Sequence, residues 1–185
     1  MSKESRHAIR PRTLEAILDA AIRLFNADSG VTMTDIAKAA GVGRATLHRH
    51  FQDKDDLIQT LSARCMEEMN AAVRATDIPD EPAVKRLHAM LKSAIPLGDR
   101  FAFLSFERME GEDLQSDYEE QLDWTTALIE QLKTEQAIAT DVPTSWAVAQ
   151  VDQVIWTAWT AVWNSELTPD EAANLALRTL LNGLS

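Results

Sequence analysis

Residues 32–57 of the chain read TMTDIAKAAGVGRATLHRHFQDKDDL, and they carry the strongest structural signal in the sequence. Thr32 is a suitable helix N-cap, and Asp35 three residues later completes a pattern like a capping box, with Asp in place of the usual Glu. This helix is expected to end at Gly41, because glycine commonly terminates helices. A second, shorter helix is expected over residues 44–51. The pattern predicts two helices joined by a tight turn.

The turn between these helices has the residue types that a steep helix crossing requires. Ala37 is small enough for the contact, and Gly41 can take a positive φ at the corner. Val42 and Leu47 supply apolar side chains beyond the turn. In a helix-turn-helix motif the second helix lies in the DNA major groove, where its early residues face base edges and flanking groups hold phosphates. The stretch therefore predicts DNA binding, with an ordinary helical hairpin that has a basic exposed face as the alternative.

The distribution of charge along the chain favours the same function. The whole 185-residue sequence has a formal net charge of −11, which by itself argues against binding to phosphates. Residues 1–54, however, contain nine Lys and Arg against six acidic residues, a local balance of +3, whereas the remainder carries −14. This asymmetry indicates a basic working end on an acidic body.

Helical periodicity extends over the whole chain, and strand signals are almost absent. The sequence therefore predicts an all-α fold. Besides the two helices above, helices are expected over residues 14–25, 53–76, 83–95, 101–109, 114–139, 146–165 and 168–183. Two domains are expected, a helix-turn-helix domain over residues 1–55 with a basic N-terminal arm and a helical body over residues 56–185.

Other classes of function find little support. The sequence has no Gly-rich phosphate loop, HExxH motif or nucleophile elbow, and its single cysteine, Cys65, lies on an apolar helix stripe. His7, His48, His50 and His88 do not form a zinc-ligand pattern with that cysteine. We therefore expect no enzymatic activity, no cofactor and no metal site. No apolar run is long enough for a transmembrane helix and the N-terminus lacks a signal-peptide core, so we expect a cytoplasmic protein without a membrane partner.

The helix-turn-helix stretch resembles the TetR (tetracycline-repressor-like) family of transcriptional regulators. In that family the N-terminal three-helix domain usually reads as Thr, then Ile-Ala, Ala-Gly-Val, Leu-Tyr-x-His-Phe, then Lys and Leu. The matching residues are Thr32, Ile36, Ala37, Ala40, Gly41, Val42, Leu47, His50, Phe51, Lys54 and Leu57. The resemblance by motif covers about residues 13–58. The chain departs from it at His48, where tyrosine is usual, and at Gly43, where serine is common.

The resemblance implies that the helix after the turn is a recognition helix, and its residue types suggest individual contacts. Arg44, at the start of this helix, is expected to contact a base edge, most naturally the bidentate edge of a guanine. Thr46 could touch a thymine methyl group or a phosphate. His48 and Lys54 are expected at phosphates.

Three further basic residues are candidates for DNA contact. Arg49 can be either a surface charge or a weak phosphate contact. Arg10 and Arg12 belong to an N-terminal arm that either reaches the minor groove or remains solvated.

Residues 148–164 place a wide apolar arc on one side of a helix and polar, uncharged residues on the other. The arc is wider than one face of a small domain needs, so part of it is expected to meet a second copy, although the Trp cluster can also fill the core. The resemblance implies a homodimer, which would place two recognition helices about one DNA turn apart, roughly 34 to 36 Å, as a palindromic operator requires. The expected interface residues are Trp159, Val162, Trp163, Ala173, Leu177 and Leu180.

The resemblance also implies a small-molecule effector bound between the middle helices. Met and aromatic residues there suit an apolar or aromatic effector, but at helical spacing such residues more often form plain core. Asp152 is unusual on the Trp-rich side of its helix, because a carboxylate there must be paired, hydrogen-bonded, or reach water or a ligand. The candidate pocket residues are Leu87, Met90, Leu91, Phe101, Leu104, Met109, Tyr118, Leu122, Asp152 and Trp156.

Together these features predict a homodimeric, ligand-responsive transcriptional regulator that binds double-stranded DNA at a palindromic operator. A repressor that the effector releases from DNA is expected from the family resemblance alone. The alternative is a helical protein-interaction module whose basic end docks on an acidic partner without specific DNA binding.

Overall fold

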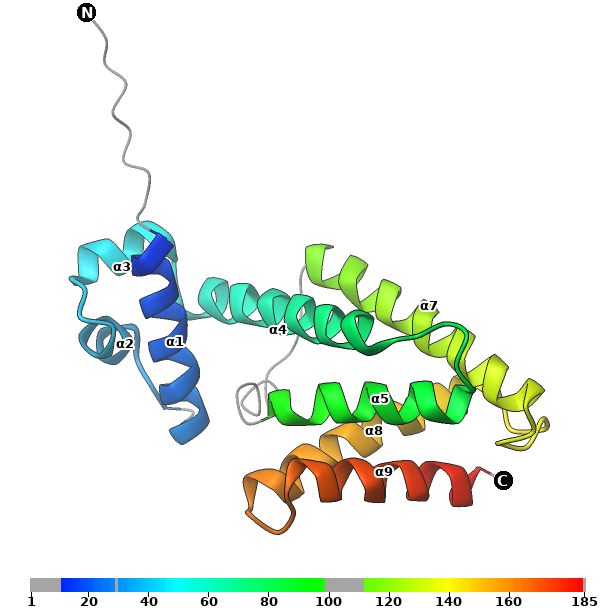
Figure 1. Ribbon diagram of the computed structural model, residues 1–185. Coiled ribbons are helices and arrows are strands. Elements are labelled where there is room, and N and C mark those ends of the chain that lie inside the picture. The colour runs from blue at the N-terminus through cyan, green and yellow to red at the C-terminus, as the bar shows by residue number, and fades with distance from the viewer. Residues whose placement is uncertain (1–10, 29, 99–111, 185) are drawn as a thin grey trace, which may run out of the picture. The chain divides into compact units, whose positions relative to one another are not determined.

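The structure, a computed structural model, describes residues 11–28, 30–98 and 112–184. Within these ranges the side chains of residue 11 and of residues 112–117 are not described. Every regular element in the described ranges is a helix, which confirms the all-α fold class (Figure 1). None of the described helices is both long and apolar enough to cross a lipid bilayer. The expected helix over residues 101–109 lies outside the described residues.

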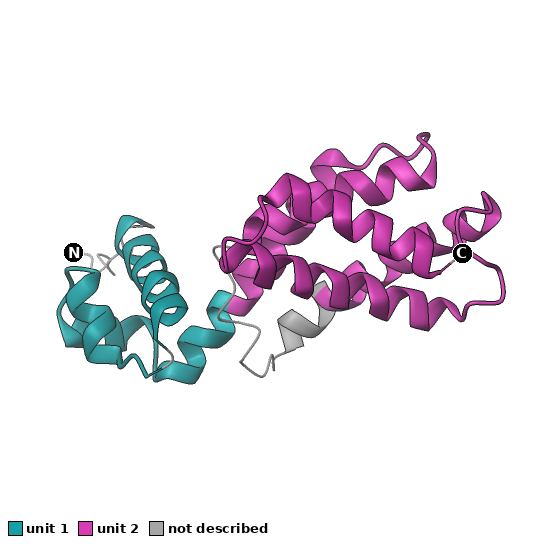
Figure 2. Ribbon diagram, turned by 90° about the horizontal axis from the view of Figure 1, so that it is seen from below, with its two compact units in different colours: residues 1–61 teal, residues 62–185 magenta. Residues whose placement is uncertain are grey.

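The chain divides into two compact units, residues 1–61 and residues 62–185 (Figure 2). The first unit contains α1 (Pro11–Ala27), α2 (Met33–Ala39) and α3 (Arg44–His50). The second unit contains α5 (Ala83–Ala94), the 3₁₀ turn η1 (Ile95–Leu97), α7 (Glu112–Thr134), α8 (Thr144–Trp163) and α9 (Pro169–Gly183). α4 (Lys54–Thr76) contributes to both units, because the division falls inside this helix.

Apolar side chains from α1 to α4 form the core of the first unit. On α1 they recur at three- to four-residue spacing, so they share one face of the helix. α3 has only seven residues and would be marginal by itself, so it depends on this packing through Leu47. The buried side chains are Ile17, Leu18, Ala21, Ile22, Phe25, Val31, Ile36, Ala37, Leu47, Phe51, Leu57 and Ile58.

The start of α2 and the turn after it have the predicted local structure. The Thr32 hydroxyl accepts a hydrogen bond from the Asp35 N–H at 3.3 Å, and the Asp35 carboxylate accepts one from the Thr32 N–H at 3.1 Å, which confirms the capping box. Gly41 has a φ of +68°, and the next residue, Val42, donates its N–H to Ala37 O at 2.9 Å. Glycine is favoured here by conformation rather than by space, because a Cβ on Gly41 would meet no atom within 4 Å.

The helices of the second unit pack in a layered bundle. α8 packs against α7 and α9, and α5 packs against α7 and α9 from the other side of the bundle (Figure 1). α9 begins with a capping box formed by Thr168 and Glu171, with Pro169 in its first turn. Its buried face carries Ala172, Ala173, Ala176 and Leu180, and the three alanines allow α9 to approach its neighbours closely.

α7 and α8 both end earlier than their periodicity predicts. Gln136 has a φ of 59°, and Ala137 donates its N–H to Leu132 O at 2.9 Å, which is the bond of a Schellman C-terminus. α7 therefore ends at Thr134 instead of continuing to residue 139. Ser165, with a φ of 58°, ends α8 in the same way. The sequence carries little warning of either end, because glycine is the usual residue at this position.

Trp159 of α8 is the central side chain in the core of the second unit. It is 3% exposed, and its indole N–H donates a hydrogen bond to Ala94 O at 3.2 Å. Its ring lies edge-to-face with that of Trp156, with centroids 4.6 Å apart. Gly98 lies so close that a Cβ on it would be 2.2 Å from Trp159 Cδ1. The absence of a side chain at residue 98 is therefore what lets Trp159 seat against η1.

The predicted dimer interface is wrong for three of its residues. Trp159, Ala173 and Leu180 are buried in the core of the chain itself, with exposed fractions of 3%, 0% and 3%. Much of the wide apolar arc of α8 packs against α7, α9 and η1. Apolar periodicity shows which face of a helix is buried but not which helix covers it. The other three predicted residues, Val162, Trp163 and Leu177, remain partly or largely exposed.

We predict that Gly98→Ala destabilises the protein by about 1–3 kcal/mol, because the added methyl group overpacks the buried ring of Trp159. Gly183→Ala is the matched control, since a Cβ at residue 183 meets no atom within 4 Å. Urea unfolding followed by circular dichroism measures both variants. Equal unfolding midpoints for the two variants would show that the contact with Trp159 does not constrain residue 98.

Candidate nucleic-acid interface and ligand cavity

α3 presents its first residue, Arg44, to solvent. Gly43 precedes it as an N-cap without a side-chain hydrogen bond. No hydrogen bond or ion pair to the Arg44 guanidinium occurs within the described part of the chain. His48 is exposed one turn later and so lies on the same face of the helix. An unengaged guanidinium has the planar donor geometry that a guanine edge or a phosphate accepts.

Thr46 and Arg49 of α3 are bonded to each other. Arg49 Nε donates to Ala45 O at 3.2 Å, and Arg49 Nη2 donates to the Thr46 hydroxyl oxygen at 3.1 Å. These bonds lay the Arg49 side chain along its own helix. The guanidinium of Arg49 is therefore engaged locally, in contrast to that of Arg44.

Lys54, at the first position of α4, is held by an aromatic side chain of α1. Its ammonium lies 5.0 Å from the centroid of the Phe25 ring, within the range of a cation–π contact. The sequence predicts that Lys54 contacts a phosphate. In the structure the contact with Phe25 positions the ammonium group, and the residue is half-buried. Arg12 is exposed in the first turn of α1, and Arg10 lies outside the described residues.

The second unit contains a cavity of about 90 Å³ between α4, α5, α7 and α8. Its walls are mostly apolar, with two methionines and one indole ring. Asn70 and Thr125 are its buried polar side chains, and the Thr125 hydroxyl donates to Gln121 O at 2.8 Å. The cavity is lined by Met69, Asn70, Val73, Arg74, Met90, Ala94, Glu120, Gln121, Trp124, Thr125 and Ile155.

The predicted pocket and the observed cavity share Met90. Leu87 and Leu91 are core residues, with exposed fractions of 1% and 0%. Phe101, Leu104 and Met109 lie outside the described residues, and Tyr118, Leu122, Asp152 and Trp156 are not among the lining side chains that the structure describes. Sequence reasoning missed α4 as a wall, although its apolar stripe contains Met69 and extends to Val73.

An ion pair spans the mouth of the cavity from α4 to α7. Arg74 Nη1 lies 2.7 Å from Glu120 Oε1, and both side chains line the cavity. Their side chains are 53% and 59% exposed, so water screens the pair and it contributes little to stability.

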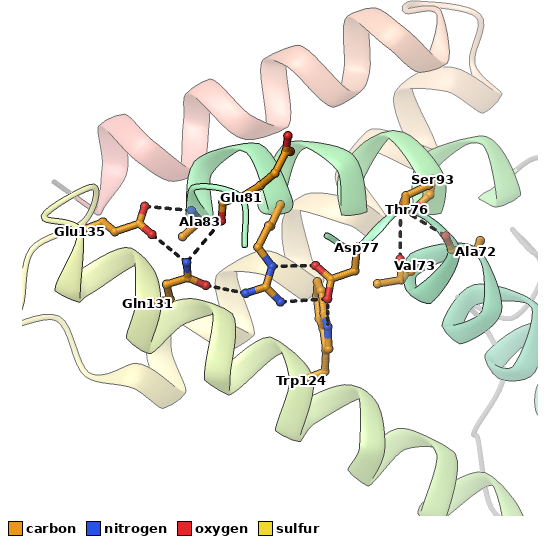
Figure 3. Close-up of polar contacts among 11 residues, drawn as sticks. Ala72, Val73, Thr76, Asp77, Glu81, Ala83, Ser93, Trp124, Gln131 and Glu135 are labelled. Carbon is orange, nitrogen blue, oxygen red and sulfur yellow. Dashed lines mark hydrogen bonds and ion pairs between the residues drawn. The ribbon is translucent and has the colours of Figure 1, made fainter. Parts of the chain in front are cut away.

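A second, more buried polar network joins the end of α4 to α5 and α7 (Figure 3). Arg86 of α5 donates to both carboxylate oxygens of Asp77, at 2.7 and 2.9 Å, and also to Gln131 Oε1 on α7. The Trp124 indole N–H donates to Asp77 Oδ2 at 3.1 Å. The hydrogen bonds from Arg86 hold the pKa of Asp77 below its ordinary value, so this carboxylate is ionised at neutral pH.

The same network caps α5. Its N-cap residue, Pro82, has no side chain that can accept a hydrogen bond. Glu135, the first residue after α7, supplies the acceptor, since its Oε2 receives the Ala83 N–H at 2.9 Å. Gln131 steadies that carboxylate by donating to Glu135 Oε1 at 2.7 Å (Figure 3). A helix start that the local sequence leaves uncapped is thus completed by a residue 52 positions away.

Asp152 of α8 is a half-buried carboxyl group near Tyr118 of α7. Burial raises the pKa of Asp152 above its ordinary value. Burial, and secondarily the charge of Asp152, raise the pKa of Tyr118. Within the described residues no hydrogen bond or ion pair to the Asp152 carboxylate is found. An ionised Asp152 is therefore unfavourable in this structure.

We predict that Asp152→Asn raises stability at pH 7 and that this gain shrinks as the pH falls toward 4. The Asp152 carboxyl binds its proton more tightly in the folded chain, so the wild type loses stability as the pH rises from its ordinary pKa of 3.8 through the raised folded value. Asparagine does not titrate. Urea unfolding at pH 4 and pH 7 tests this, and a difference between the two proteins that stays constant with pH would contradict it.

Residues 17–61, from α1 into α4, match the family described as bacterial regulatory proteins, tetR family. The α2–turn–α3 motif lies inside this match. The N-terminal part of the chain is thus similar to TetR-family regulators. The chain is 36% identical over 98 residues to the HTH-type transcriptional repressor LfrR of Mycolicibacterium smegmatis, an alignment that covers 53% of this chain and 52% of LfrR.

The HTH-type transcriptional regulator BetI of Rhizobium meliloti is 33% identical to the chain over 101 residues, which cover 51% of this chain and 47% of BetI. The chain thus spans about half the length of the curated relatives LfrR and BetI. Both relatives are named as transcriptional regulators rather than as enzymes.

Solved structures extend the likeness to nearly the whole chain. The crystal structure of LfrR from Mycobacterium smegmatis in complex with proflavine has a TM-score of 0.78 and 26% identity, and the match covers 95% of this chain and 98% of that chain. The fatty acid degradation regulator FadR from Bacillus halodurans has a TM-score of 0.76, with coverage of 94% and 96%. At 18% identity FadR supports the fold alone.

Proposed function

We propose that this chain is a TetR-family, sequence-specific DNA-binding transcriptional regulator that acts as a homodimer. The observation that carries the proposal is α3, which follows the Gly41 turn and presents Arg44 to solvent without a partner among the described residues. The first unit would be the DNA-binding domain and the second the effector-binding and dimerisation domain. Repression is the expected mode, because the relative LfrR is named as a repressor. Acting on DNA places the protein in the cytoplasm.

Selection of the purified protein against a random duplex library tests this function. Washing with and without about 0.5 M salt separates specific binding from the exposed-charge attraction that such salt screens. An enriched palindrome is the expected result, because a twofold dimer reads two equivalent half-sites. Recovery of random duplex in low salt and of nothing in high salt would contradict sequence-specific binding.

We predict that Arg44→Ala weakens binding to the selected palindrome by about 1–3 kcal/mol and relaxes selectivity at one base pair of each half-site. Arg178→Ala, an exposed arginine of α9 in the second unit, is the matched control and should bind as the wild type does. Fluorescence anisotropy with the palindrome and its single-base variants measures both effects. Unchanged base selectivity in Arg44→Ala would exclude Arg44 as a base-reading residue.

For the dimer, we propose that the exposed face of α8 contacts a second copy of the chain. Ala149, Gln153, Thr157 and Thr160 are exposed, are spaced along one face and carry no charge. The hydroxyls of Thr157 and Thr160 donate to the carbonyls of Gln153 and Trp156 of the same helix, at 2.9 and 3.0 Å, so each threonine can turn its methyl group outward. An uncharged face suits an interface, whose core is depleted of charged residues.

α9, which packs against α8, also carries an exposed leucine. Leu175 is 40% exposed, and Trp163 at the end of α8 is 47% exposed. Large apolar side chains at the margins of an uncharged face favour a protein partner over solvent. The resemblance to homodimeric regulators selects a second copy of this chain as that partner.

We predict that Thr157→Glu raises the dissociation constant of the dimer about tenfold or more, because twofold symmetry places both new carboxylates in one interface. Thr126→Glu makes the same change at an exposed threonine of α7 and should leave the dimer intact. Sedimentation velocity over a concentration series distinguishes the two. A Thr157→Glu variant that sediments as the wild type does would move the interface away from this face.

We further propose that the cavity between α4, α5, α7 and α8 binds a small, largely apolar or aromatic effector. The mostly apolar lining and the solved complex of the similar LfrR with proflavine support this class. Effector binding would shift the helices around the cavity and, through α4, alter the separation of the two recognition helices in the dimer. Such a shift requires that the effector bind the DNA-free state more tightly than the DNA-bound state.

A further inference from the structure

The Trp124 side chain takes part both in the cavity wall and in the polar network around Asp77. Its ring forms part of the cavity wall, and its indole N–H donates to Asp77 Oδ2 at 3.1 Å (Figure 3). Asp77 is the first residue after α4, so the acceptor of this bond is fixed to the C-terminal end of that helix. A movement of the ring away from the cavity centre therefore changes the hydrogen bonding at the end of α4.

The acceptor, Asp77, is held in a defined place. Arg86 binds it through two parallel hydrogen bonds, and the side chains of Arg86 and Asp77 are only 14% and 13% exposed. A bidentate, shielded pair of this kind is stronger and more directional than an exposed ion pair. The Arg86 guanidinium also lies 6.0 Å from the centroid of the Trp124 ring. Trp124, Asp77 and Arg86 thus form one unit, which we call the α4 clasp.

The volume of the cavity makes movement of its wall necessary. A dry cavity of about 150 Å³ is known to hold benzene, whereas this cavity measures about 90 Å³. A planar aromatic ligand therefore fits wholly inside the cavity only if a lining side chain moves. Met69 and Met90 are buried, at 7% and 5% exposure, and have neighbours behind them, whereas Trp124 is only half-buried and has solvent beside it. Trp124 is consequently the large lining group with room to move.

We propose that Trp124 is a positioning residue that couples ligand binding in the cavity to the C-terminal end of α4. A planar aromatic ligand displaces the Trp124 ring, the displaced indole releases Asp77, and the last turn of α4 becomes less restrained. The consequence for DNA binding rests on the proposed function, but the opening of the clasp does not. α4 contributes residues to both compact units, so restraint at its end is a property that ligand binding in the second unit can change.

Hydrogen exchange of the full-length protein tests the clasp without DNA. Trp124→Phe keeps an aromatic ring in the cavity wall and removes the N–H donor, together with the second ring of the indole. Amides of residues 73–77 are expected to exchange about fivefold faster in this variant, which is the effect of one lost hydrogen bond on local opening. Trp146→Phe, the same substitution at a tryptophan of α8 that is 59% exposed, is the matched control and should leave these amides unchanged.

Ligand coupling is measured with two planar probes, the cation proflavine and uncharged acridine. In the wild type and in Trp146→Phe, a bound probe should speed exchange of residues 73–77 by a similar factor. In Trp124→Phe the probe should bind within about threefold of its wild-type affinity, because the ring is retained, yet cause no further change in exchange. This loss of coupling at preserved affinity is an effect that a purely structural role for Trp124 does not produce.

Three results would overturn the proposal. They are wild-type exchange rates in Trp124→Phe, a bound probe that leaves residues 73–77 unaffected in the wild type, and failure of both probes to bind the wild type. Should Trp124→Phe fail to fold, Asp77→Asn replaces it, since it keeps the size of the acceptor side chain and removes the charge that holds Arg86. If the protein shows the exchange pattern but selects no palindrome, the clasp proposal stands and the proposed DNA-binding function fails. If it selects a palindrome but does not show the exchange pattern, the DNA-binding function stands and the clasp proposal fails.

Discussion

The bidentate pair between Arg86 and Asp77 is the interaction on which the second unit depends most. α4, α5 and α7 supply most of the cavity wall. The pair, together with Trp124 and Gln131, links the end of α4 to α5 and α7. The hydrogen bonds that the Asp77 carboxylate accepts from Arg86 and Trp124 are 2.7 to 3.1 Å long. Both side chains of the pair are shielded from water, so loss of either partner would leave the other without compensation. The exposed pair between Arg74 and Glu120 joins two of the same helices, but water screens it.

In the first unit, apolar packing and turn geometry rather than a polar network hold the key helix, α3, in place. α3 is too short to be stable alone, lacks a side-chain cap at Gly43 and is held by Leu47 beneath it and by the turn at Gly41 before it. Because packing and turn geometry hold the helix from one side, the residues on its other side need not stabilise it. Arg44 and His48 are therefore free to contact a ligand, whereas Arg49 is engaged along its own helix. This division of tasks within seven residues is what a DNA-reading helix requires.

α8 shows how one helix can serve two surfaces. Much of its apolar arc is buried inside the chain around Trp159, and its uncharged opposite face remains exposed. The sequence predicts that part of the apolar arc meets a second copy while the Trp cluster can fill the core, and the structure adds the exposed, uncharged side as a second candidate surface. The threonines on that side satisfy their hydroxyls within the helix, which makes the face less polar than its composition indicates.

The sequence by itself determined the features that depend on neighbouring residues. The capping boxes at Thr32 and Thr168 and the turn at Gly41 arise from groups three or four positions apart, and the helical periodicity arises from the same short range. Only the tertiary structure decided which helices form the cavity, that Trp124 lies in its wall, and that Trp159 is core. Those properties depend on side chains that meet from distant parts of the chain, such as Glu135 at the start of α5. A pattern along one helix contains the direction of its buried face but not the identity of the surface that covers it.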